Sequence, residues 1–272
     1  MKTEAKVIAD SVSLDGVRLT TLQVCFPRFI LAEVNTHRML SRNFRSSRAV
    51  PVAKLIEEVR TSPFLPSQFT RNQAGMQGGE ALSGSELARA EQAWREAAEL
   101  AAYYAELLAD AGVHKQYANR GLEPYLYVHG VISATEWENF FNLRCHKDAQ
   151  PEFQELACLV RVALTTSTPK LREYGEWHLP YVFDHERETC GLEQLRRLSA
   201  ARCAWVSYTP FEPGDEHNYI KANRTFDKLM STPMHASPME HVAVPEGPFE
   251  GRAPGNFTGW AQWRHELERQ HG

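Results

Sequence analysis

The sequence has 272 residues and a formal net charge of -4, with an estimated isoelectric point near 6.3. This balance argues against general coating of DNA or of an anionic membrane, although it is compatible with a local basic site. The composition, 43% apolar and 24% charged, is ordinary for a soluble globular enzyme, and the length allows one large domain or two small ones.

The cysteine pattern and the absence of long apolar stretches indicate a cytoplasmic protein. The five cysteines are scattered, odd in number and include no Cys-x-x-Cys pair, which favours reduced thiols. The N-terminal residues lack an apolar signal region, and no stretch approaches the roughly 18 apolar residues of a membrane-spanning helix. We therefore expect neither secretion nor a membrane span.

The first half of the chain predicts strands followed by helices. Residues 5–27 alternate and are rich in β-branched side chains, which predicts two strands around the turn at Gly16. Residues 28–40 are expected to become helical, and Pro51 is placed to start another helix. Residues 61–84 are rich in Gly, Pro, Gln and Ser and predict a long loop of the kind that often serves as a lid.

A long helix is predicted after this loop. Ser83 and Glu86 have the spacing of a capping box at its start, and Gly112 marks its end. Residues 135–166 predict two more helices, separated near Pro151.

The last third of the chain mixes element types. Residues 203–210 predict a short strand or turn, and 218–232 a helix. Residues 235–245 should run from a loop into a strand, and 255–270 from a loop into a helix. The mixed order favours one α+β domain.

The arginine-rich segment, Thr36 to Arg48, reads THRMLSRNFRSSR and is the most unusual stretch of the chain. Arginine supplies forked donors, while Ser and Asn supply short neutral ones, so the segment suits phosphates or carboxylates. A solvated helix face with salt bridges explains the charges alone equally well.

A second polar stretch, NFFNLRCHKDAQ, spans residues 139–150. Arg144 and Asp148 have the spacing of an i,i+4 ion pair, which is its simplest structural interpretation. Cys145 and His146 are neighbours, so on a helix their side chains would point apart, which argues against a nucleophile and base.

A third stretch, HASPMEHVAV at 235–244, places Glu240 between two histidines. Pro238 interrupts the run, and no further side chain at ligand spacing completes a zinc site, so we expect no metal. The glycine patterns of Rossmann folds, P-loops and hydrolase elbows are absent from the sequence.

Together these stretches resemble the flavin-dependent thymidylate synthase family, and more closely its variant forms carried by phages. The family signature Arg-His-Arg-x-x-Ser-x-Asn-Glu-x-Ser-x-Arg is matched by the arginine-rich segment, with Thr36 for the first Arg and Phe44 for the Glu. A second family motif, similar to NFLxLRxxxxAQ, is matched by residues 139–150.

Two further family motifs are present in a different order. The family opens with a segment like ARVSY and then HxTPFEH, whereas here RCAWVSY (202–208) and HASPMEHV (235–242) follow the signature. This order resembles a circular permutation, which nearby chain termini permit. The resemblance implies a single α+β domain over 1–272, with a twisted, mostly antiparallel sheet and flanking long helices. Residues 1–169 would carry the signature and the helical half, and 199–272 the motifs that are usually N-terminal.

A partial duplicate accompanies this order. The family has an element like RQWxRHR before the signature; the N-terminal copy here, AEVNTHR at 32–38, lacks its Gln, Trp and first Arg. The C-terminal copy, GWAQWRHE at 259–266, has Gln262, Trp263 and Arg264. We expect residues 256–266 to pack beside the arginine-rich segment, in the same or a neighbouring subunit, because two tryptophans favour burial. A harmless exposed remnant is the alternative.

The resemblance implies transfer of a one-carbon unit from methylenetetrahydrofolate to C5 of a pyrimidine deoxynucleoside monophosphate, with FAD as cofactor and NADPH as reductant. The expected reaction is dUMP to dTMP. Methylation or hydroxymethylation of dUMP or dCMP for modified phage DNA is the alternative, because Phe44, Ser133, Thr135 and Asp148 depart from the family pattern. A non-catalytic relative that binds nucleotides or nucleic acid is the alternative of another class, and the acidic total argues against nucleic acid.

The resemblance also implies roles for individual residues. Arg144 would be catalytic, contacting the pyrimidine ring and favouring negative charge on it. The nucleotide would be bound by Ser46, Arg48, Arg120, Arg144, Gln262 and Arg264. FAD would be bound by His37, Arg38, Ser41, Asn43, Asn139, Ser207, His235, Ser237 and Glu240. Family members are tetramers with shared sites, so a homotetramer is expected, in the host cytoplasm if a phage encodes it.

Overall fold

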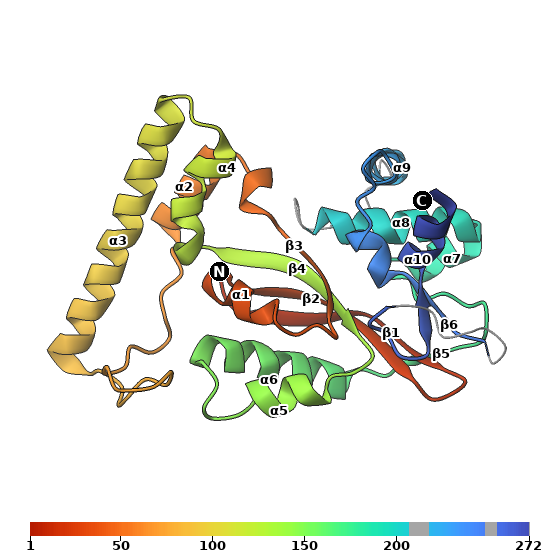
Figure 1. Ribbon diagram of the computed structural model, residues 1–272, viewed down its shortest axis with the longest axis horizontal. Helices are drawn as coiled ribbons and strands as arrows, with labels where there is room; N and C mark the ends of the chain where they lie inside the picture. The colour runs from red at the N-terminus through yellow and green to blue at the C-terminus, as the bar shows by residue number, and fades with distance from the viewer. Residues whose placement is uncertain (207–217, 248–254, 272) are drawn as a thin grey trace.

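The alternating N-terminal segment forms the centre of a mixed, mostly antiparallel sheet. In a computed structural model that describes residues 1–206, 218–247 and 255–271, β1 (Glu4–Ser13) and β2 (Arg18–Pro27) form the predicted hairpin. Gly16 closes its turn with a φ of 78°. β3 (Ser41–Phe44), β4 (Tyr127–Ala134) and β5 (Lys170–Arg172) complete the order β3-β4-β2-β1-β5, in which β5 runs parallel to β1 (Figure 1).

Helices and a short second sheet surround this main sheet. The second sheet pairs β6 (Ala243–Pro245) with β7 (Trp260–Gln262). The α-helices are α1 (Leu31–Val34), α2 (Val52–Thr61), α3 (Gly84–Asp110), α4 (Lys115–Ala118), α5 (Glu138–Arg144), α6 (Pro151–Thr166), α7 (Asp184–Thr189), α8 (Leu192–Trp205), α9 (Asn218–Leu229) and α10 (Trp263–His271). The 3-10 helices are η1 (Arg28–Ile30), η2 (Ser47–Ala49), η3 (Arg120–Tyr125) and η4 (Ser237–His241).

The alternation of β2 divides its side chains between two layers. Val24 and Phe26 are fully buried and pack in the cluster that contains Phe153 of α6, which lies below the sheet with α5 in Figure 1. Thr21 and Gln23 point to the other layer, where Thr21 hydrogen-bonds to His178 (2.8 Å) and Gln23 accepts a bond from Tyr181 (2.7 Å). β2 is therefore covered on both faces.

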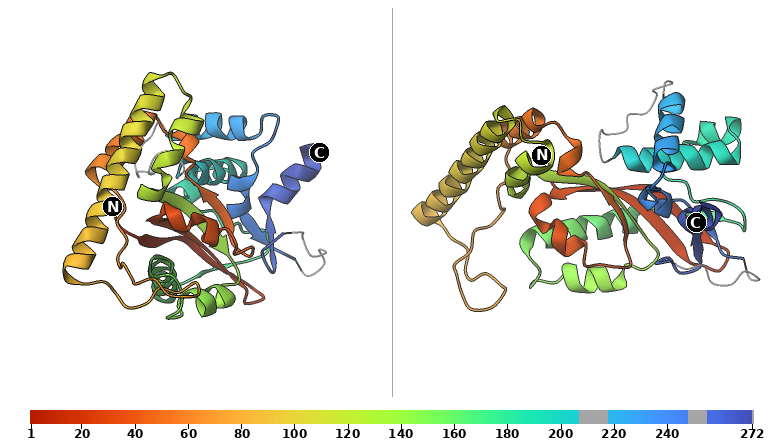
Figure 2. Two further views of the ribbon diagram at one scale, coloured as in Figure 1. Left: turned by 60° about the vertical axis from the view of Figure 1, so that its left-hand side comes forward. Right: turned by 45° about the horizontal axis from the view of Figure 1, so that its top comes forward.

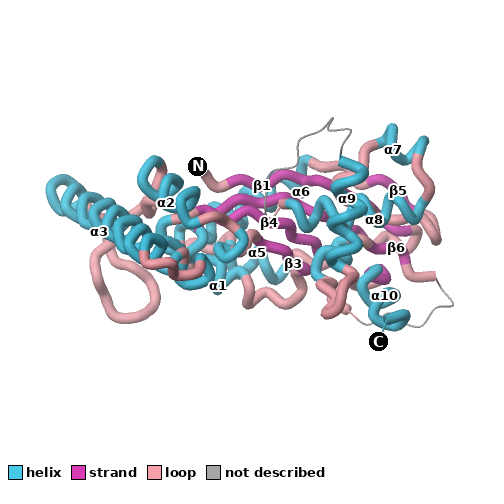
Figure 3. The backbone as a smooth tube through the Cα atoms, turned by 90° about the horizontal axis from the view of Figure 1, so that it is seen from above, coloured by secondary structure: helices cyan, strands magenta, loops and turns pink. Residues whose placement is uncertain are grey.

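An arm of helices lies at one end of the molecule and the C-terminal helices lie at the other. α2, α3 and η3 share a core cluster that includes Leu55, Ala102 and Leu122. At the opposite end, α8, α9, α10 and η4 enclose Phe226, Met239 and other buried side chains (Figures 2 and 3). The arginine-rich segment lies between them, because it runs from α1 through β3 into η2.

Three local predictions are wrong. Ser83 forms no side-chain cap on α3, and Glu86 instead pairs with Arg71 from the preceding loop. Residues 203–205 end helix α8 instead of forming a strand or turn, and 207–210 lie outside the described residues. Asp148 does not pair with Arg144; the nearest ion-pair partner of Asp148 is His146 (3.5 Å). In the first case a side chain from another segment satisfies Glu86 better than its local partner, and in the third case Arg144 bonds instead to His37 of the arginine-rich segment.

None of the helices among the described residues has the length and apolar character needed to cross a bilayer. The described residues also contain no cluster of three or more His, Cys, Asp or Glu side chains that could hold a metal ion.

Candidate functional site

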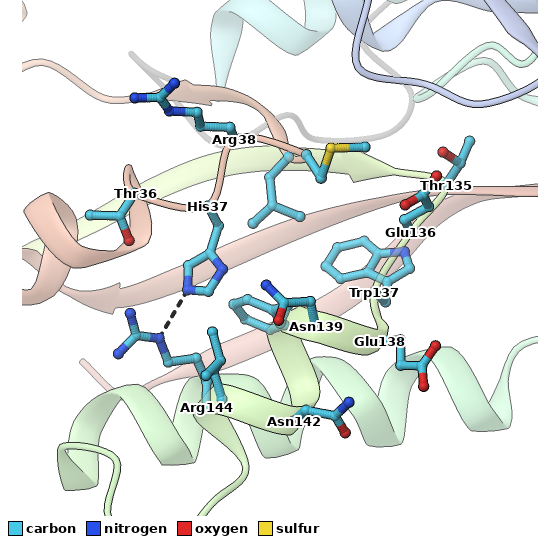
Figure 4. Close-up of a pocket in the computed structure, with 14 residues that line it drawn as sticks. Thr36, His37, Arg38, Thr135, Glu136, Trp137, Glu138, Asn139, Asn142 and Arg144 are labelled. Carbon is cyan, nitrogen blue, oxygen red and sulfur yellow. Dashed lines mark hydrogen bonds between the residues drawn. The ribbon is translucent and has the colours of Figure 1, made fainter.

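A cavity of about 850 Å³ opens where the arginine-rich segment faces helix α5 (Figure 4). Its walls combine the end of the N-terminal copy and the residues after it, the segment that follows β4, and most of α5. The lining residues are Thr36, His37, Arg38, Met39, Leu40, Thr135, Glu136, Trp137, Glu138, Asn139, Phe140, Asn142, Leu143 and Arg144. The structure thus brings the two polar stretches of the sequence to one place, although they lie about a hundred residues apart.

A hydrogen bond between His37 and Arg144 forms the polar centre of this cavity. The Nε of Arg144 donates to Nε2 of His37 at 2.9 Å, and the guanidinium carbon of Arg144 lies 4.4 Å from the centre of the Phe153 ring. His37 is itself held by edge contacts to Phe140 and Phe153. Aromatic packing therefore fixes both partners.

His37 is neutral at physiological pH. Burial, together with the positive charges of Arg144 and Arg42, lowers the pKa of its imidazole to about 4. A neutral imidazole can accept the hydrogen bond from Arg144. The terminal NH2 groups of Arg144 have no partner among the described residues, so they are available to a ligand.

The other predicted cofactor residues on this side differ in orientation. Asn139 lines the cavity near His37, whereas Arg38 points away from Arg144 on the opposite side of the segment (Figure 4). Trp137 also lines the cavity, and its indole N–H is buried without a hydrogen-bond partner among the described residues. The cavity therefore offers neutral and cationic donors around an aromatic wall.

The C-terminal copy packs against β3, as its sequence predicts. Gln262 is buried and donates from Nε2 to the Ser41 hydroxyl (2.9 Å) and to the backbone oxygen of Glu240 (3.0 Å). The Ser41 hydroxyl in turn donates to Asn256 (3.0 Å), whose amide reaches the backbone oxygen of Arg38. Asn256 and Gln262 thus contact Ser41 of β3 from 215 and 221 residues away.

The C-terminal copy also holds the motif at 235–242. The carboxylate of Glu240 forms an ion pair with Arg264, which also pairs with Glu268 (2.7 Å). His235 and Ser237 are exposed, and Ser207 lies outside the described residues. Asn43 faces α8, where its amide donates to the backbone oxygen of Cys203 (2.9 Å).

A buried polar chain that the sequence did not reveal links this motif to the sheet. His241 Nδ1 lies 2.8 Å from the Ser133 hydroxyl, which is 2.5 Å from that of Thr21. Thr21 contacts Nε2 of His178, whose Nδ1 lies 2.8 Å from Ser11. Burial lowers the pKa of both histidines to about 3, so both are neutral. No local motif marks His178, because each of its partners is distant in sequence.

The residues that depart from the family pattern have structural roles here. The Phe44 ring packs edge-on against Phe26 (5.4 Å between centroids) and covers Gly130, where a Cβ would collide with it at 2.0 Å. Thr135 accepts a hydrogen bond from the backbone N–H of Thr258 (3.0 Å). Phe44 therefore stabilises the sheet and carries no charge toward a ligand.

Most of the predicted nucleotide residues lie outside the lining of this cavity. Ser46 and Arg48 lie at η2, beyond the end of β3, and Arg48 is exposed without an ion pair among the described residues. Arg120 lies at η3, where it pairs with Glu123 (2.9 Å). The buried Asn119 joins η3 to η2 by donating to the backbone oxygens of Ser47 and Val50. Arg144 is the member of this set that lines the cavity.

Known proteins resemble this chain in sequence and in fold. The family model Thy1, described as thymidylate synthase complementing protein, matches residues 18–170. Two solved structures of the UMP/dUMP methylase PolB from Streptomyces cacaoi are similar in fold. The structure with 5-Br UMP has a TM-score of 0.50 at 17% identity, covering 60% of this chain and 89% of that one. The structure with 5-Br dUMP has a TM-score of 0.49 at 16% identity, covering 60% and 90%. No curated protein matches significantly.

Proposed function

Because the chain belongs to the thymidylate synthase complementing protein family, we propose that it transfers a one-carbon unit to C5 of a pyrimidine deoxynucleoside monophosphate. The proposed donor is methylenetetrahydrofolate, the proposed cofactor is FAD, and the proposed reaction is dUMP to dTMP. The observation that carries this proposal is the bond between Arg144 and the neutral His37, in a cavity built from the two family motifs.

The chemistry of the cavity fits a flavin. The partnerless indole N–H of Trp137 is a buried donor, and Asn139 and Asn142 add neutral donors nearby. Arg38 at the rim is suited to a pyrophosphate, because a guanidinium binds phosphate oxygens in pairs. FAD, when bound, would supply the redox chemistry, with NADPH as the source of electrons.

Arg144 would polarise the substrate ring. Its Nε is engaged by His37, which leaves its two terminal NH2 groups without a hydrogen-bond partner among the described residues. Donors of this kind stabilise negative charge that develops on a pyrimidine carbonyl during attack from C5. His37 orients the guanidinium without adding a second positive charge, since its pKa is lowered to about 4.

We assign the nucleotide phosphate to Ser46, Arg48 and Arg120, a group outside the cavity lining. A dianion needs forked donors, and Arg48 has no competing ion pair among the described residues. The separation of this group from Arg144 supports a site completed between subunits of a homotetramer. Ser41, Asn43, His235, Ser237 and Glu240 would then border the cofactor from the side of η4.

The test is a product assay. The purified protein is incubated with FAD, NADPH and methylenetetrahydrofolate, and with dUMP, dCMP or UMP in separate reactions, and each product is identified by mass spectrometry. UMP is included because the structures of similar fold are of a UMP/dUMP methylase. We expect dUMP to gain a methyl group. A hydroxymethyl product, or a preference for dCMP, would replace the proposed reaction, and the absence of any product and of nucleotide binding would refute it.

Matched arginine variants locate the chemistry. Arg144→Ala should lower turnover by roughly 100-fold to 1,000-fold, the usual effect of removing a donor to developing charge. Arg161→Ala removes an exposed arginine from the neighbouring helix α6 and should leave turnover unchanged. Equal effects of the two substitutions would contradict the role of Arg144.

A further inference from the structure

The cavity beside His37 has two ends of opposite charge. Arg38 and Arg144 lie at one end, and Glu136 and Glu138 lie at the other, here named the acidic end (Figure 4). Neither carboxylate forms an ion pair among the described residues. Because like charges repel, the acidic end disfavours a phosphate, whereas the cationic end attracts one. A phosphate-bearing ligand is therefore oriented in the cavity, with an uncharged part toward Glu136.

Trp137 supplies an unused hydrogen-bond donor at the acidic end. Its side chain is 8% exposed, and its buried indole N–H has no hydrogen-bond partner among the described residues. A buried donor without an acceptor opposes folding, so an acceptor is expected in the functional state. Trp137 lines the cavity beside Glu136 (Figure 4), so a ligand atom placed there can be that acceptor.

A segment from the C-terminal part of the chain holds Glu136 in place. The Thr258 hydroxyl donates to Oε1 of Glu136, and the backbone N–H of Thr258 donates to the Thr135 hydroxyl (3.0 Å). Thr258 is anchored by its neighbours, because Phe257 is 2% exposed and Asn256 accepts a hydrogen bond from β3 (3.0 Å). Oε2 of Glu136 has no hydrogen-bond partner among the described residues. One carboxylate oxygen is thus positioned, and the other is open to a ligand.

Glu138 has a structural explanation that Glu136 lacks. Glu138 is the first residue of α5, where the unpaired backbone N–H groups of a helix start favour a carboxylate. Glu136 lies outside α5, in the segment that follows β4, and is exposed. The helix therefore accounts for the acid at 138 and leaves the acid at 136 to a ligand.

A pair of neighbouring hydroxyl groups matches the acidic end best. A hydroxyl both donates and accepts, so it can donate to Glu136 while it accepts from Trp137. A phosphate oxygen only accepts and would be repelled, and an ammonium only donates and would leave the indole N–H unsatisfied. Acidic side chains bind ribose hydroxyls in this way in dinucleotide-binding folds. The chemical class that the acidic end suits is therefore a ribose.

We propose that Glu136, positioned by Thr258, binds the 2′ and 3′ hydroxyls of a ribose at the acidic end, with the phosphate of the same ligand toward Arg38. Glu136 is then a specificity-determining residue, and Thr258 is a positioning residue. The inference rests on the proposed function, which supplies ligands of this class. FAD carries such a ribose in its adenosine half, and UMP carries one too, whereas dUMP lacks the 2′ hydroxyl.

The test uses two pairs of ligands that differ in one hydroxyl. Calorimetry measures the affinity of wild type and of Glu136→Ala for FAD and its 2′-deoxyadenosine analogue, and for UMP and dUMP. In one pair, the ligand with the 2′ hydroxyl should lose roughly 10-fold to 100-fold in affinity, the usual effect of losing a hydrogen bond to a charged group, and its deoxy partner should lose less. A loss in the FAD pair identifies the cofactor as the source of the ribose, and a loss in the UMP pair identifies the substrate. Glu57→Ala, at an exposed position on α2, is the matched control and should change none of the affinities.

Further variants separate positioning from folding. Thr258→Val removes the hydroxyl that orients Glu136 and should weaken the same ligand by a smaller factor, whereas Thr258→Ser keeps the hydroxyl and should restore the affinity. Circular dichroism checks that each variant is folded. If Glu136→Ala does not fold, Glu136→Gln, which keeps the shape and removes the charge, is measured in its place and should weaken the same ligand by a smaller factor.

Equal losses within both ligand pairs, or no loss in either, overturn the proposal. The product assay separates this failure from that of the proposed function. A wild type that methylates dUMP, combined with a Glu136 variant that binds all four ligands as the wild type does, refutes this inference alone. A wild type that binds neither flavin nor nucleotide refutes both.

Discussion

The two copies of one sequence element are used in opposite ways. The N-terminal copy (32–38) ends at the cavity, where His37 holds Arg144 and Arg38 is exposed. The C-terminal copy (259–266) turns its polar groups inward, where Gln262 bonds to Ser41 and Arg264 pairs with Glu240. Neighbouring tryptophans explain the difference, because Trp260 and Trp263 are buried and carry the adjacent Gln262 into the interior. A similar motif can thus present ligand donors or support the strand that presents them.

Removing the C-terminal copy should have the largest effect. Deleting residues 255–272 removes Phe257 and Trp260 from the buried cluster that contains Leu19. It also removes Trp263 from the cluster enclosed by the C-terminal helices. A buried tryptophan alone is worth about 3–5 kcal/mol, so we expect the C-terminal half to unfold. Circular dichroism and limited proteolysis of the truncated protein measure this. A truncated protein that stays folded and fully active would identify the copy as a remnant.

Acid should break the buried polar chain that joins the motif at 235–242 to the sheet. Unfolded histidines take up protons as the pH falls below about 6.5, whereas His178 and His241 keep a pKa of about 3 in the fold. Their contribution to stability is therefore full above pH 6.5 and is lost as the pH falls toward 3, by about 1.4 kcal/mol per pH unit for each histidine. Arg172 and Arg187 near His178 favour its neutral form and Asp10 opposes it, without reversing the direction.

Urea unfolding at about pH 8 and about pH 5 measures this loss. His241→Gln stays uncharged at both values, so its stability should fall less steeply than that of the wild type. Equal slopes for the two proteins would show that His241 is not the buried neutral group that the structure describes.

Substitutions at His37 test the N-terminal copy. His37→Phe cannot accept the bond from Arg144 and should lower turnover roughly 10-fold to 100-fold, since the guanidinium loses its orientation. His37→Gln keeps an acceptor and should restore most of the rate. The ratio of the two rates shows whether His37 acts by orienting the Arg144 guanidinium or only by filling space. If Gln is no better than Phe, the hydrogen bond is not what His37 contributes.

Gln262→Ala should destabilise the protein without touching the cavity. The change leaves the buried Ser41 hydroxyl and the backbone oxygen of Glu240 without a donor, which costs about 2 kcal/mol. Urea unfolding gives this value, and FAD content measured by absorbance should be unchanged. Gln270, an exposed glutamine on α10, provides the matched control and should tolerate alanine.

Arg264→Ala should have the smallest effect on stability, about 0.5 kcal/mol, because its ion pairs with Glu240 and Glu268 are partly exposed. The same variant sharpens the comparison between the copies. A loss of nucleotide affinity much larger than the loss of stability would place Arg264 with the ligand groups, as the sequence resemblance predicts. An unchanged affinity would assign it to the scaffold.

Sequence reasoning located the elements well where their pattern is local. The hairpin around Gly16, helix α3 and the break at Pro151 follow from alternation, helical periodicity and backbone restriction. It failed for Glu86, whose spacing to Ser83 suggests a cap but whose carboxylate is taken by Arg71. A cap and an ion pair compete for one side chain, and the loop that supplies Arg71 is placed by the tertiary structure.

The candidate site shows the same division. Family motifs pointed to His37, Asn139 and Arg144, and the structure places all three at one cavity. They gave no reason to select Trp137, which stands two residues before the second motif, or His178. Periodicity describes neighbours along the chain, whereas these side chains matter through partners on other elements.

By itself the sequence determined the strand and helix periods, the concentration of arginine between 36 and 48, and the family to which these motifs belong. Only the tertiary structure decided that Arg144 binds His37, 107 residues away, instead of Asp148, four residues further along the chain. It also decided that Gln262 supports β3 from 221 residues away. The physical reason is that a long-range hydrogen bond costs little once the packing of the sheet and helices has already ordered both partners, while a local pair near the surface competes with water.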